Sequence, residues 1–293
     1  MLKQLAIVLI GLSSPTLAQT VSVDTYTGTV EVAMNPEKIA VFDLAAMDSL
    51  QALGVKANGL VSPVYLPYLE AAVKGTKSVG SLFEPDFEAV NAMQFDLIVA
   101  GGRSSTQAPE LAKMAPTIDM TIWEDPIGQG LARLEAYGAI FGKVEEAAAL
   151  EAEFQVQLEA TKQAVANKGN ALIVMTNGPK VSAYGLGGRF GWLHSALDLP
   201  EAVASVEEST HGEAISFEFI REANPDILIV IDRFAAIGRE GANAKTTLDN
   251  ALVHGTKAWA EGKVVYLDSA PIYIAGGGIQ SMNKTLKEIA ATF

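Results

Sequence analysis

The stretch FEAVNAMQFDLIVAGGR at residues 87–103 is matched 130 residues later by FEFIREANPDILIVIDR at residues 217–233. Both copies begin with Phe-Glu, carry an Asp in the middle and end on an Arg, with no gap between these positions. In each copy an amphipathic segment predicts a helix, and the apolar run after it predicts a buried strand. Agreement across helix, strand and loop indicates an internal duplication and therefore two related halves.

Around the two copies, short apolar runs alternate with amphipathic stretches. Residues 39–42 and 117–123 predict further strands, residues 47–53 predict a helix that ends at Gly54, and a new half begins at residues 171–175. This alternation is typical of α/β layers, so we predict two α/β lobes with mostly parallel sheets.

The middle of the chain has a different pattern. Residues 127–165 are rich in Ala, Glu and Leu, with apolar side chains recurring on one helix face. We predict one long or broken helix here, with Gly138 and Gly142 as candidate interruptions, and a ligand cleft between the two lobes that it bridges.

We expect four parts in the chain: a signal peptide at 1–18, an N-terminal α/β lobe at 19–125, a bridging helix region at 126–166 and a C-terminal α/β lobe at 167–293. The first part has a cationic start, a short apolar run and small residues up to Ala18, which is the layout of a secretory signal. The alternatives are a retained membrane anchor and a buried first strand. A hairpin is predicted to follow at 21–32, and we expect the mature protein in a bacterial periplasm.

Composition excludes several classes of protein. The chain has 21 Lys and Arg against 34 Asp and Glu, a net charge of −13, which disfavours nucleic-acid binding. With 49% hydrophobic and 19% charged residues it is not a disordered chain. It has no cysteine, which excludes disulfides, Cys nucleophiles, thiolate metal sites and a lipidated cysteine.

Enzyme signatures are also missing from the sequence. There is no Gly-x-Ser-x-Gly, His-Glu-x-x-His or Walker motif. The glycines at 185–188 do not keep the dinucleotide-binding spacing, and no cluster of His and carboxylates has the spacing of a site for a bare transition metal.

Three arginines lie beside glycines or directly after a strand. Arg103 follows two glycines, Arg189 follows two others, and Arg233 follows the strand of the second copy. A guanidinium group binds paired anionic oxygens, and flanking glycines let a bulky ligand approach the backbone. The three predict an anion site if they converge, and otherwise three separate surface salt bridges, with Asp232 beside Arg233. The arginines that we expect at ordinary surface positions are Arg133, Arg221 and Arg239.

Two further side chains are candidates for ligand contact. His211 lies on a glycine-containing loop before the second copy, and Tyr273 precedes the glycine run at 276–278. His211 could equally be an ordinary surface residue, and Tyr273 could cover a sheet edge. We expect His194 to be structural and His254 to be solvated.

The ordered set of motifs resembles the periplasmic iron–siderophore binding proteins of ABC importers, and among them the catecholate-siderophore branch. The resemblance covers nearly the whole mature chain. The segments that carry it are VGSLFEPDFE (79–88), DLIV (96–99), GRFG (188–191), HG (211–212), NPDI (224–227), DR (232–233) with AIG (236–238), LDNAL (248–252) and VYLD (265–268), which leads to Tyr273.

The resemblance implies a fold of two α/β lobes bridged by one long helix. It also implies that Arg103, Arg189 and Arg233 hold a ferric catecholate, with His211 and Tyr273 completing the iron shell when the siderophore supplies only four donors. The ferric ion would then be cargo bound as a siderophore chelate, with no intrinsic cofactor and no catalytic activity. The stretch at 270–272 lacks the aromatic residues expected beside such a ligand, which leaves the ligand's shape open.

The resemblance further implies that Glu88 and Glu218, one on each lobe, dock a monomeric protein onto an inner-membrane permease. Both could instead be glutamates favoured at helix starts by the helix dipole, and Glu84 competes for the first role. Alternative cargoes are haem, a hydroxamate siderophore or a corrinoid. An enzyme acting on the chelate is a further alternative, which the missing motifs oppose.

Overall fold

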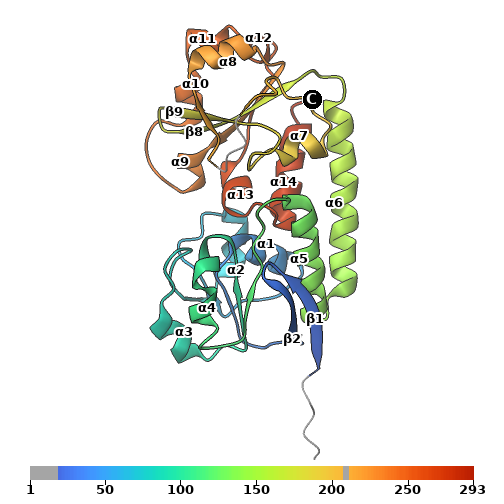
Figure 1. Cartoon of the computed structure of the whole chain (residues 1–293), viewed down its shortest axis with the longest axis vertical. Helices are drawn as coiled ribbons and strands as arrows, with labels where there is room; N and C mark the ends of the chain where they lie inside the picture. The colour runs from blue at the N-terminus through green and yellow to red at the C-terminus, as the bar shows by residue number, and fades with distance from the viewer. Residues whose placement is uncertain (1–18, 207–210) are drawn as a thin grey trace, which may run out of the picture.

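The computed structural model describes residues 19–206 and 211–293, and the predicted signal peptide at 1–18 lies outside these ranges. Figure 1 shows two α/β lobes stacked along the long axis of the molecule, with a long helix running along one side. The predicted fold class is therefore confirmed. Within the described ranges, no helix is long and apolar enough to cross a membrane.

The N-terminal lobe is built on a five-stranded sheet with the order β5-β4-β3-β6-β7, in which every pair is parallel. Its strands are β3 (Ile39–Val41), β4 (Gly59–Leu60), β5 (Lys77–Ser78), β6 (Leu97–Ala100) and β7 (Thr117–Asp119). Its helices, of which η1 and η2 are 3₁₀, are α1 (Leu44–Ala52), η1 (Pro67–Leu69), α2 (Glu70–Val73), α3 (Phe87–Met93), η2 (Gly102–Gln107) and α4 (Ala108–Leu111). The predicted hairpin precedes this lobe as the antiparallel pair β1 (Thr20–Thr25) and β2 (Gly28–Ala33).

The strand predicted at 117–123 is shorter in the structure and ends at Asp119. The Asp119 carboxylate accepts hydrogen bonds from the backbone N–H of Thr121 at 3.0 Å and from its hydroxyl at 2.6 Å. A side chain that bonds the backbone two residues on favours a turn over a continuing strand.

The C-terminal lobe has a mixed five-stranded sheet with the order β10-β9-β8-β11-β12. Its strands are β8 (Ala171–Asn177), β9 (Lys180–Tyr184), β10 (Glu213–Ile215), β11 (Ile227–Asp232) and β12 (Val264–Tyr266). Strands β8, β11 and β12 are parallel, but β9 pairs antiparallel with both β8 and β10. A two-residue turn joins β8 to β9, and Gly178 there has a φ of 61°, which favours glycine. The helices are α7 (Trp192–Ala196), α8 (Phe217–Ala223), α9 (Arg233–Ala236), α10 (Ala244–Leu248), α11 (Ala251–His254), α12 (Lys257–Ala260), α13 (Ser269–Ile274) and α14 (Ile279–Ala290).

The duplicated segments adopt the same local structure. The first forms α3 and β6 and the second forms α8 and β11, and both helices end on a left-handed residue, Gln94 or Asn224. Asp96 and Asp226 each accept a hydrogen bond from the backbone N–H of the residue just before the neighbouring strand, β3 or β8, at 2.7 and 3.0 Å. The shared Asp therefore joins two parallel strands at the same point in each lobe.

The helical region between the lobes is broken rather than continuous. Helix α5 (Pro126–Ile140) and helix α6 (Val144–Val165) are separated at Gly142, which has a φ of 63°. Gly138 lies inside α5, where an added Cβ would come within 2.8 Å of the Ala147 side chain. Of the two predicted interruptions, only Gly142 is one, and Gly138 instead lets α5 pack closely on α6.

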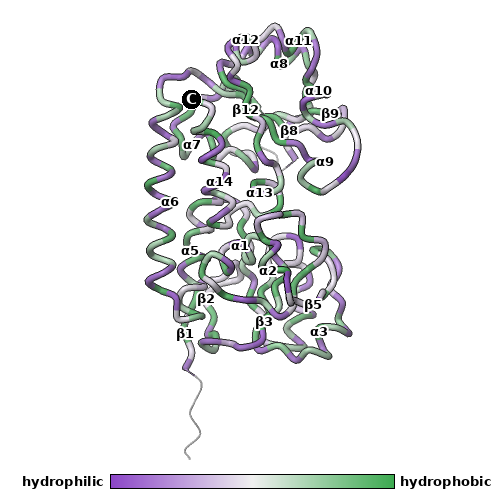
Figure 2. Tube along the Cα trace, turned by 180° about the vertical axis from the view of Figure 1, so that it is seen from behind, coloured by the Kyte–Doolittle hydropathy of each residue, from purple (hydrophilic) through white to green (hydrophobic). Residues whose placement is uncertain are grey.

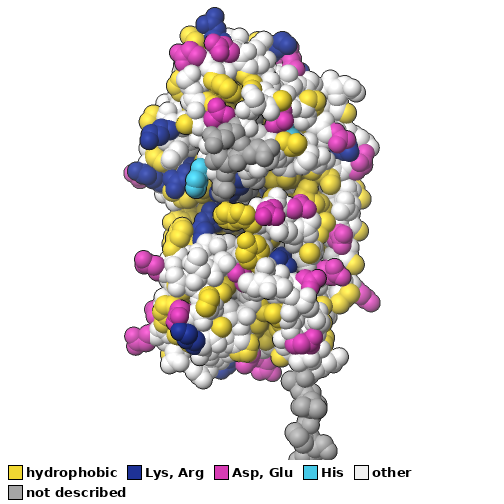
Figure 3. Space-filling view, in the orientation of Figure 1, with side chains coloured by type: hydrophobic (Ala, Val, Ile, Leu, Met, Phe, Trp, Pro, Cys, Tyr) yellow, Lys and Arg dark blue, Asp and Glu magenta, His cyan; other side chains and the backbone are white. Residues whose placement is uncertain are grey.

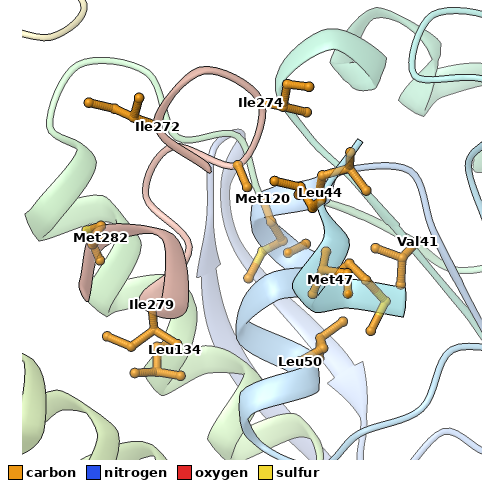
Figure 4. Close-up of a cluster of buried hydrophobic side chains, with 14 of the residues drawn as sticks. Val41, Leu44, Met47, Leu50, Met120, Leu134, Ile272, Ile274, Ile279 and Met282 are labelled. Carbon is orange, nitrogen blue, oxygen red and sulfur yellow. The ribbon is translucent and has the colours of Figure 1, made fainter. Parts of the chain in front are cut away.

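The last helix, α14, lies beside α6 in both Figure 1 and Figure 2. The buried Thr161 hydroxyl of α6 donates to the Leu286 carbonyl of α14 at 3.2 Å. Figure 4 shows the apolar packing at the start of α14, where side chains of α13 and α14 meet side chains of α1. These residues are Ile272, Ile274, Ile279 and Met282 on one side and Leu44, Met47 and Leu50 on the other.

A buried carboxylate secures the start of α14 to α1. Asp48 of α1 accepts hydrogen bonds from the Tyr68 hydroxyl at 2.6 Å and from the backbone N–H groups of Gln280 and Ser281 at 2.7 and 3.0 Å. It supplies the capping group that Gly278, at the N-cap of α14, lacks. The chain after β12 is thereby attached to the N-terminal lobe. The domain boundaries expected from the sequence, at 19–125, 126–166 and 167–293, stay a prediction.

Replacing Asp48 by asparagine should change how stability depends on pH. Burial raises the pKa of Asp48 to about 7, even though its hydrogen bonds oppose the rise. Between about pH 4 and pH 7 the folded state therefore holds a proton that the unfolded chain releases, so the free energy of unfolding should fall as pH rises. Urea unfolding at several pH values should show this fall in the wild-type protein and a smaller one in Asp48→Asn.

The matched control is Asp86→Asn, at the exposed N-cap of α3, where asparagine caps as well as aspartate. This variant should follow the wild-type pH profile. Parallel profiles for Asp48→Asn and the wild-type protein would contradict the role assigned to Asp48.

Candidate functional site

Three arginines from different parts of the chain surround one tyrosine. Arg103 lies in η2 after β6, Arg189 lies in the loop after β9, and Arg233 opens α9 directly after β11. Their Cζ atoms lie 5.5, 4.5 and 5.9 Å from the centre of the Tyr273 ring. The structure thus brings together all three of the arginines that the sequence singled out.

Hydrogen bonds to both ends of Tyr273 hold this arrangement. An Nη atom of Arg103 donates to the Tyr273 backbone carbonyl at 3.1 Å, and Arg189 donates to the same oxygen. Arg233 donates from Nε to the Tyr273 hydroxyl at 3.0 Å. The carbonyl is available because α13 ends at Ile274 and leaves its last carbonyl groups without helical partners.

The three guanidinium groups form no salt bridge in the part of the chain that the structure describes, although Asp43 lines the same cavity and interacts electrostatically with Arg103. In residues 19–206 and 211–293, no carboxylate lies within salt-bridge distance of any of them. The carboxylate of Asp232, beside Arg233 in the sequence, instead accepts the backbone N–H groups of Ala235 and Ala244 at 3.1 and 2.7 Å. The positive charge of the cluster therefore remains available to an anionic ligand.

The cluster lies in a cavity between the lobes. This cavity, which we call the first cavity, has a volume of about 510 Å³ and is lined by all three arginines, Tyr273 and His211. A second cavity of about 770 Å³ adjoins it on the C-terminal lobe and shares Arg189, Arg233, Tyr273 and His211. Figure 3 shows cationic side chains and a histidine gathered at the hollow between the lobes.

Charge and burial shift the pKa values of two groups in this cluster. Burial lowers the pKa of Arg189, and the like charge of Arg103 lowers it further. Burial alone would raise the pKa of the Tyr273 phenol, but the hydrogen bond from Arg233 and the charges of the three arginines outweigh it, so the pKa lies below its ordinary value. The site therefore favours an anionic oxygen at the position of the Tyr273 hydroxyl.

The histidines occupy different environments. His211 lines both cavities, and its backbone carbonyl accepts the Tyr184 hydroxyl at 2.9 Å. His194 is buried, with Nδ1 2.9 Å from the Leu199 carbonyl, as expected for a structural histidine. Nowhere in the two described ranges do three or more His, Asp or Glu side chains gather as a metal site would require.

The two candidate docking residues lie outside the first cavity, on matching helices of the two lobes. Glu88 and Glu218 are exposed in the first turns of α3 and α8. Figure 1 places these helices toward opposite ends of the molecule. Glu218 also borders the second cavity, and hydrogen bonds from its own backbone N–H and from the Ser216 hydroxyl lower its pKa.

One arginine expected on the surface is buried. Arg133 of α5 is only 6% exposed and donates to the backbone carbonyls of Asp24 at 2.6 Å and Thr121 at 3.4 Å. The expectation was wrong because the β1–β2 hairpin packs against α5, a contact that no local sequence pattern indicates.

Several residues that line the first cavity were not among the sequence candidates. Asp43, Phe83 and Trp123 come from the N-terminal lobe, on loops that follow β3, β5 and β7. Position on a loop that follows a parallel strand could have suggested all three, because ligands of open α/β sheets bind at the carboxyl ends of the strands.

The comparisons with known proteins agree with this architecture. A family model described as periplasmic binding protein matches residues 39–271, and the chain belongs to this family. The petrobactin-binding protein YclQ of Bacillus subtilis is 36% identical over 265 residues, which cover 88% of this chain and 83% of YclQ. The ferric-anguibactin-binding protein FatB of Vibrio anguillarum is 30% identical over 271 residues, which cover 89% of this chain and 84% of FatB.

Solved structures of related proteins have the same fold. The crystal structure of YclQ superposes with a TM-score of 0.87 at 34% identity, covering 94% of this chain and 98% of YclQ. The periplasmic catecholate-siderophore binding protein VctP of Vibrio cholerae superposes with a TM-score of 0.86 at 29% identity, covering 93% of this chain and 100% of VctP. The family predicted from the motifs is confirmed, and these relatives are named as binding proteins rather than enzymes.

Proposed function

We propose that this protein is the substrate-binding component of an ABC importer, which binds a ferric catecholate siderophore in the periplasm and delivers it to an inner-membrane permease. The observation that carries the proposal is the convergence of Arg103, Arg189 and Arg233 in one cavity, where none of them forms a salt bridge with a carboxylate of the described residues. Ferric catecholates are anionic, and guanidinium groups bind anionic oxygens through charge-assisted hydrogen bonds. The names of YclQ, FatB and VctP support the same class of ligand.

His211 and Tyr273 are proposed to complete the iron shell of a tetradentate bis-catecholate, which leaves two positions open on the ferric ion. Ferric iron is a hard cation that favours anionic oxygen, and the lowered pKa of Tyr273 favours its phenolate. Both residues line the first cavity beside the arginines. Iron would enter and leave as part of the chelate, and we propose neither a resident cofactor nor a catalytic role.

We further propose that Glu88 and Glu218 contact the permease and that the protein works as a monomer. Both glutamates are exposed, and each occupies the same position in its copy of the duplicated segment. A matched pair of carboxylates on two lobes suits contact with two related permease subunits.

Loss of one arginine should weaken binding of an anionic chelate strongly. Trp192 lines the cavity, so tryptophan fluorescence can follow titration with ferric bis-catecholate, tris-catecholate and hydroxamate complexes. Because a charge-assisted contact contributes about 1.5–3 kcal/mol, Arg233→Met should raise the Kd for the bis-catecholate by about tenfold or more. Arg221→Met, at an exposed position outside the cavity, is the matched control and should bind like the wild-type protein. Equally weak binding of all three complexes by the wild-type protein would refute the proposed ligand class.

Removal of the proposed iron ligands should change the visible spectrum of the bound complex. His211→Ala and Tyr273→Phe should each shift the charge-transfer band of the bound ferric bis-catecholate, because each removes one donor from the ferric ion. The tris-catecholate complex, whose six donors come from the siderophore, provides the control and should show no shift. An unchanged bis-catecholate spectrum in both variants would exclude the two residues from the iron shell.

The docking proposal predicts a loss of transport without a loss of binding. The double variant Glu88→Ala with Glu218→Ala should abolish uptake of iron chelate by cells that carry the permease, while its Kd for the chelate stays within about twofold, because both side chains are exposed outside the first cavity. The control carries Glu145→Ala with Glu151→Ala, two exposed glutamates of α6. Normal uptake by the first double variant would rule out the docking role.

A further inference from the structure

Two large aromatic side chains at the first cavity are exposed to solvent. The Phe83 side chain is 64% exposed and that of Trp123 is 55% exposed, although both line the cavity that contains the arginine cluster. Apolar side chains that are exposed together at one cleft are a mark of a ligand-binding groove or an interaction surface. Neither residue has a part in the function proposed above.

Local hydrogen bonds fix the backbone at both rings. The Ser81 hydroxyl accepts the backbone N–H groups of Phe83 at 3.2 Å and Glu84 at 3.0 Å, which closes a tight loop at Phe83. The side-chain oxygen of Gln129 accepts the backbone N–H of Trp123 at 2.7 Å. The backbone of a loop fixed in this way does not have to be ordered when a ligand arrives, which lowers the entropic cost of contact.

The two rings line the cavity from loops at the two edges of the N-terminal sheet. Phe83 follows β5 and Trp123 follows β7, which are the two edge strands, whereas Arg103 follows β6 between them. Arg189 and Arg233 line the same cavity from the C-terminal lobe. A ligand held by the arginines would therefore lie in a cavity to which each edge of the sheet contributes one aromatic ring.

We infer that Phe83 and Trp123 form an aromatic clamp that selects chelates with aryl rings on their surface. This inference rests on the proposed function, because it assumes that the arginines hold an anionic iron chelate. The arginines respond to charge and would accept a carboxylate chelate as well as a catecholate. The clamp discriminates between the two, because catechol rings pack against Phe83 and Trp123 by offset or edge-to-face contact, whereas an aliphatic carboxylate chelate offers no ring.

The test compares an aryl chelate with an aliphatic one. Equilibrium dialysis of iron would measure the affinity of the full chain for ferric dihydroxybenzoate and for ferric citrate. Phe83→Leu and Trp123→Leu keep an apolar side chain but remove the ring. Each should raise the Kd for ferric dihydroxybenzoate by about five- to tenfold, the scale of one aromatic pair with its buried area. Their affinity for ferric citrate should stay at the wild-type level.

The control is Leu186→Ala, which removes another exposed apolar side chain, 53% exposed, next to glycines that line the cavity. It should bind both chelates like the wild-type protein. Equal weakening of both chelates by the two ring variants would overturn the clamp as a selector, and so would unchanged binding of both. Unchanged binding with lost cellular uptake would assign the rings to the permease instead. A wild-type protein that bound neither chelate would refute the proposed function itself.

Discussion

Three like-charged guanidinium groups meet at a single tyrosine, and the rest of the structure is arranged around that contact. Arg103, Arg189 and Arg233 repel one another, and the lowered pKa of Arg189 reflects both its burial and the neighbouring charge. The carbonyl and the hydroxyl of Tyr273 offset part of this cost by accepting hydrogen bonds from all three. Because the acceptors are mostly neutral, the cluster keeps a net positive charge, which a carboxylate partner would have cancelled. An anionic ligand therefore finds donors that are already oriented.

The scaffold fixes Tyr273 relative to both lobes. Arg103 reaches it from the N-terminal lobe, and Arg189 and Arg233 reach it from the C-terminal lobe. The segment that carries Tyr273 continues into α14, whose first turn is capped by Asp48 of α1 and whose apolar side chains share a core with α1 (Figure 4). Since α14 also packs along α6, the tyrosine stands where elements of both lobes meet. A shared core of this kind favours small adjustments over wide separation of the lobes.

The charge of the whole chain and the charge of the cavity have opposite signs. A net charge of −13 disfavours the distant approach of an anionic chelate, but salt screens such interactions beyond about 8–10 Å. Inside the cavity the guanidinium groups lie close to a ligand and are partly desolvated, so their attraction is screened less. Selection among anionic chelates then depends on the groups that line the cavity, which in our proposal include the uncharged rings of Phe83 and Trp123 as well as the arginines.

Features that a few neighbouring residues encode could be predicted from the sequence. The match between 87–103 and 217–233 predicted the α3–β6 and α8–β11 units, and the arginines that follow glycines or a strand could be singled out from their immediate neighbours alone. Apolar periodicity and capping act over one or two turns of chain, so such patterns can be recognised locally. The packing of distant elements, in contrast, brings Arg103 and Arg189, separated from Tyr273 by 170 and 84 residues, to the same backbone carbonyl. The burial of Arg133 and the position of Phe83 and Trp123 at the cavity also depend on how whole elements pack. These contacts could not be predicted, because a backbone carbonyl that accepts a hydrogen bond has no sequence signature.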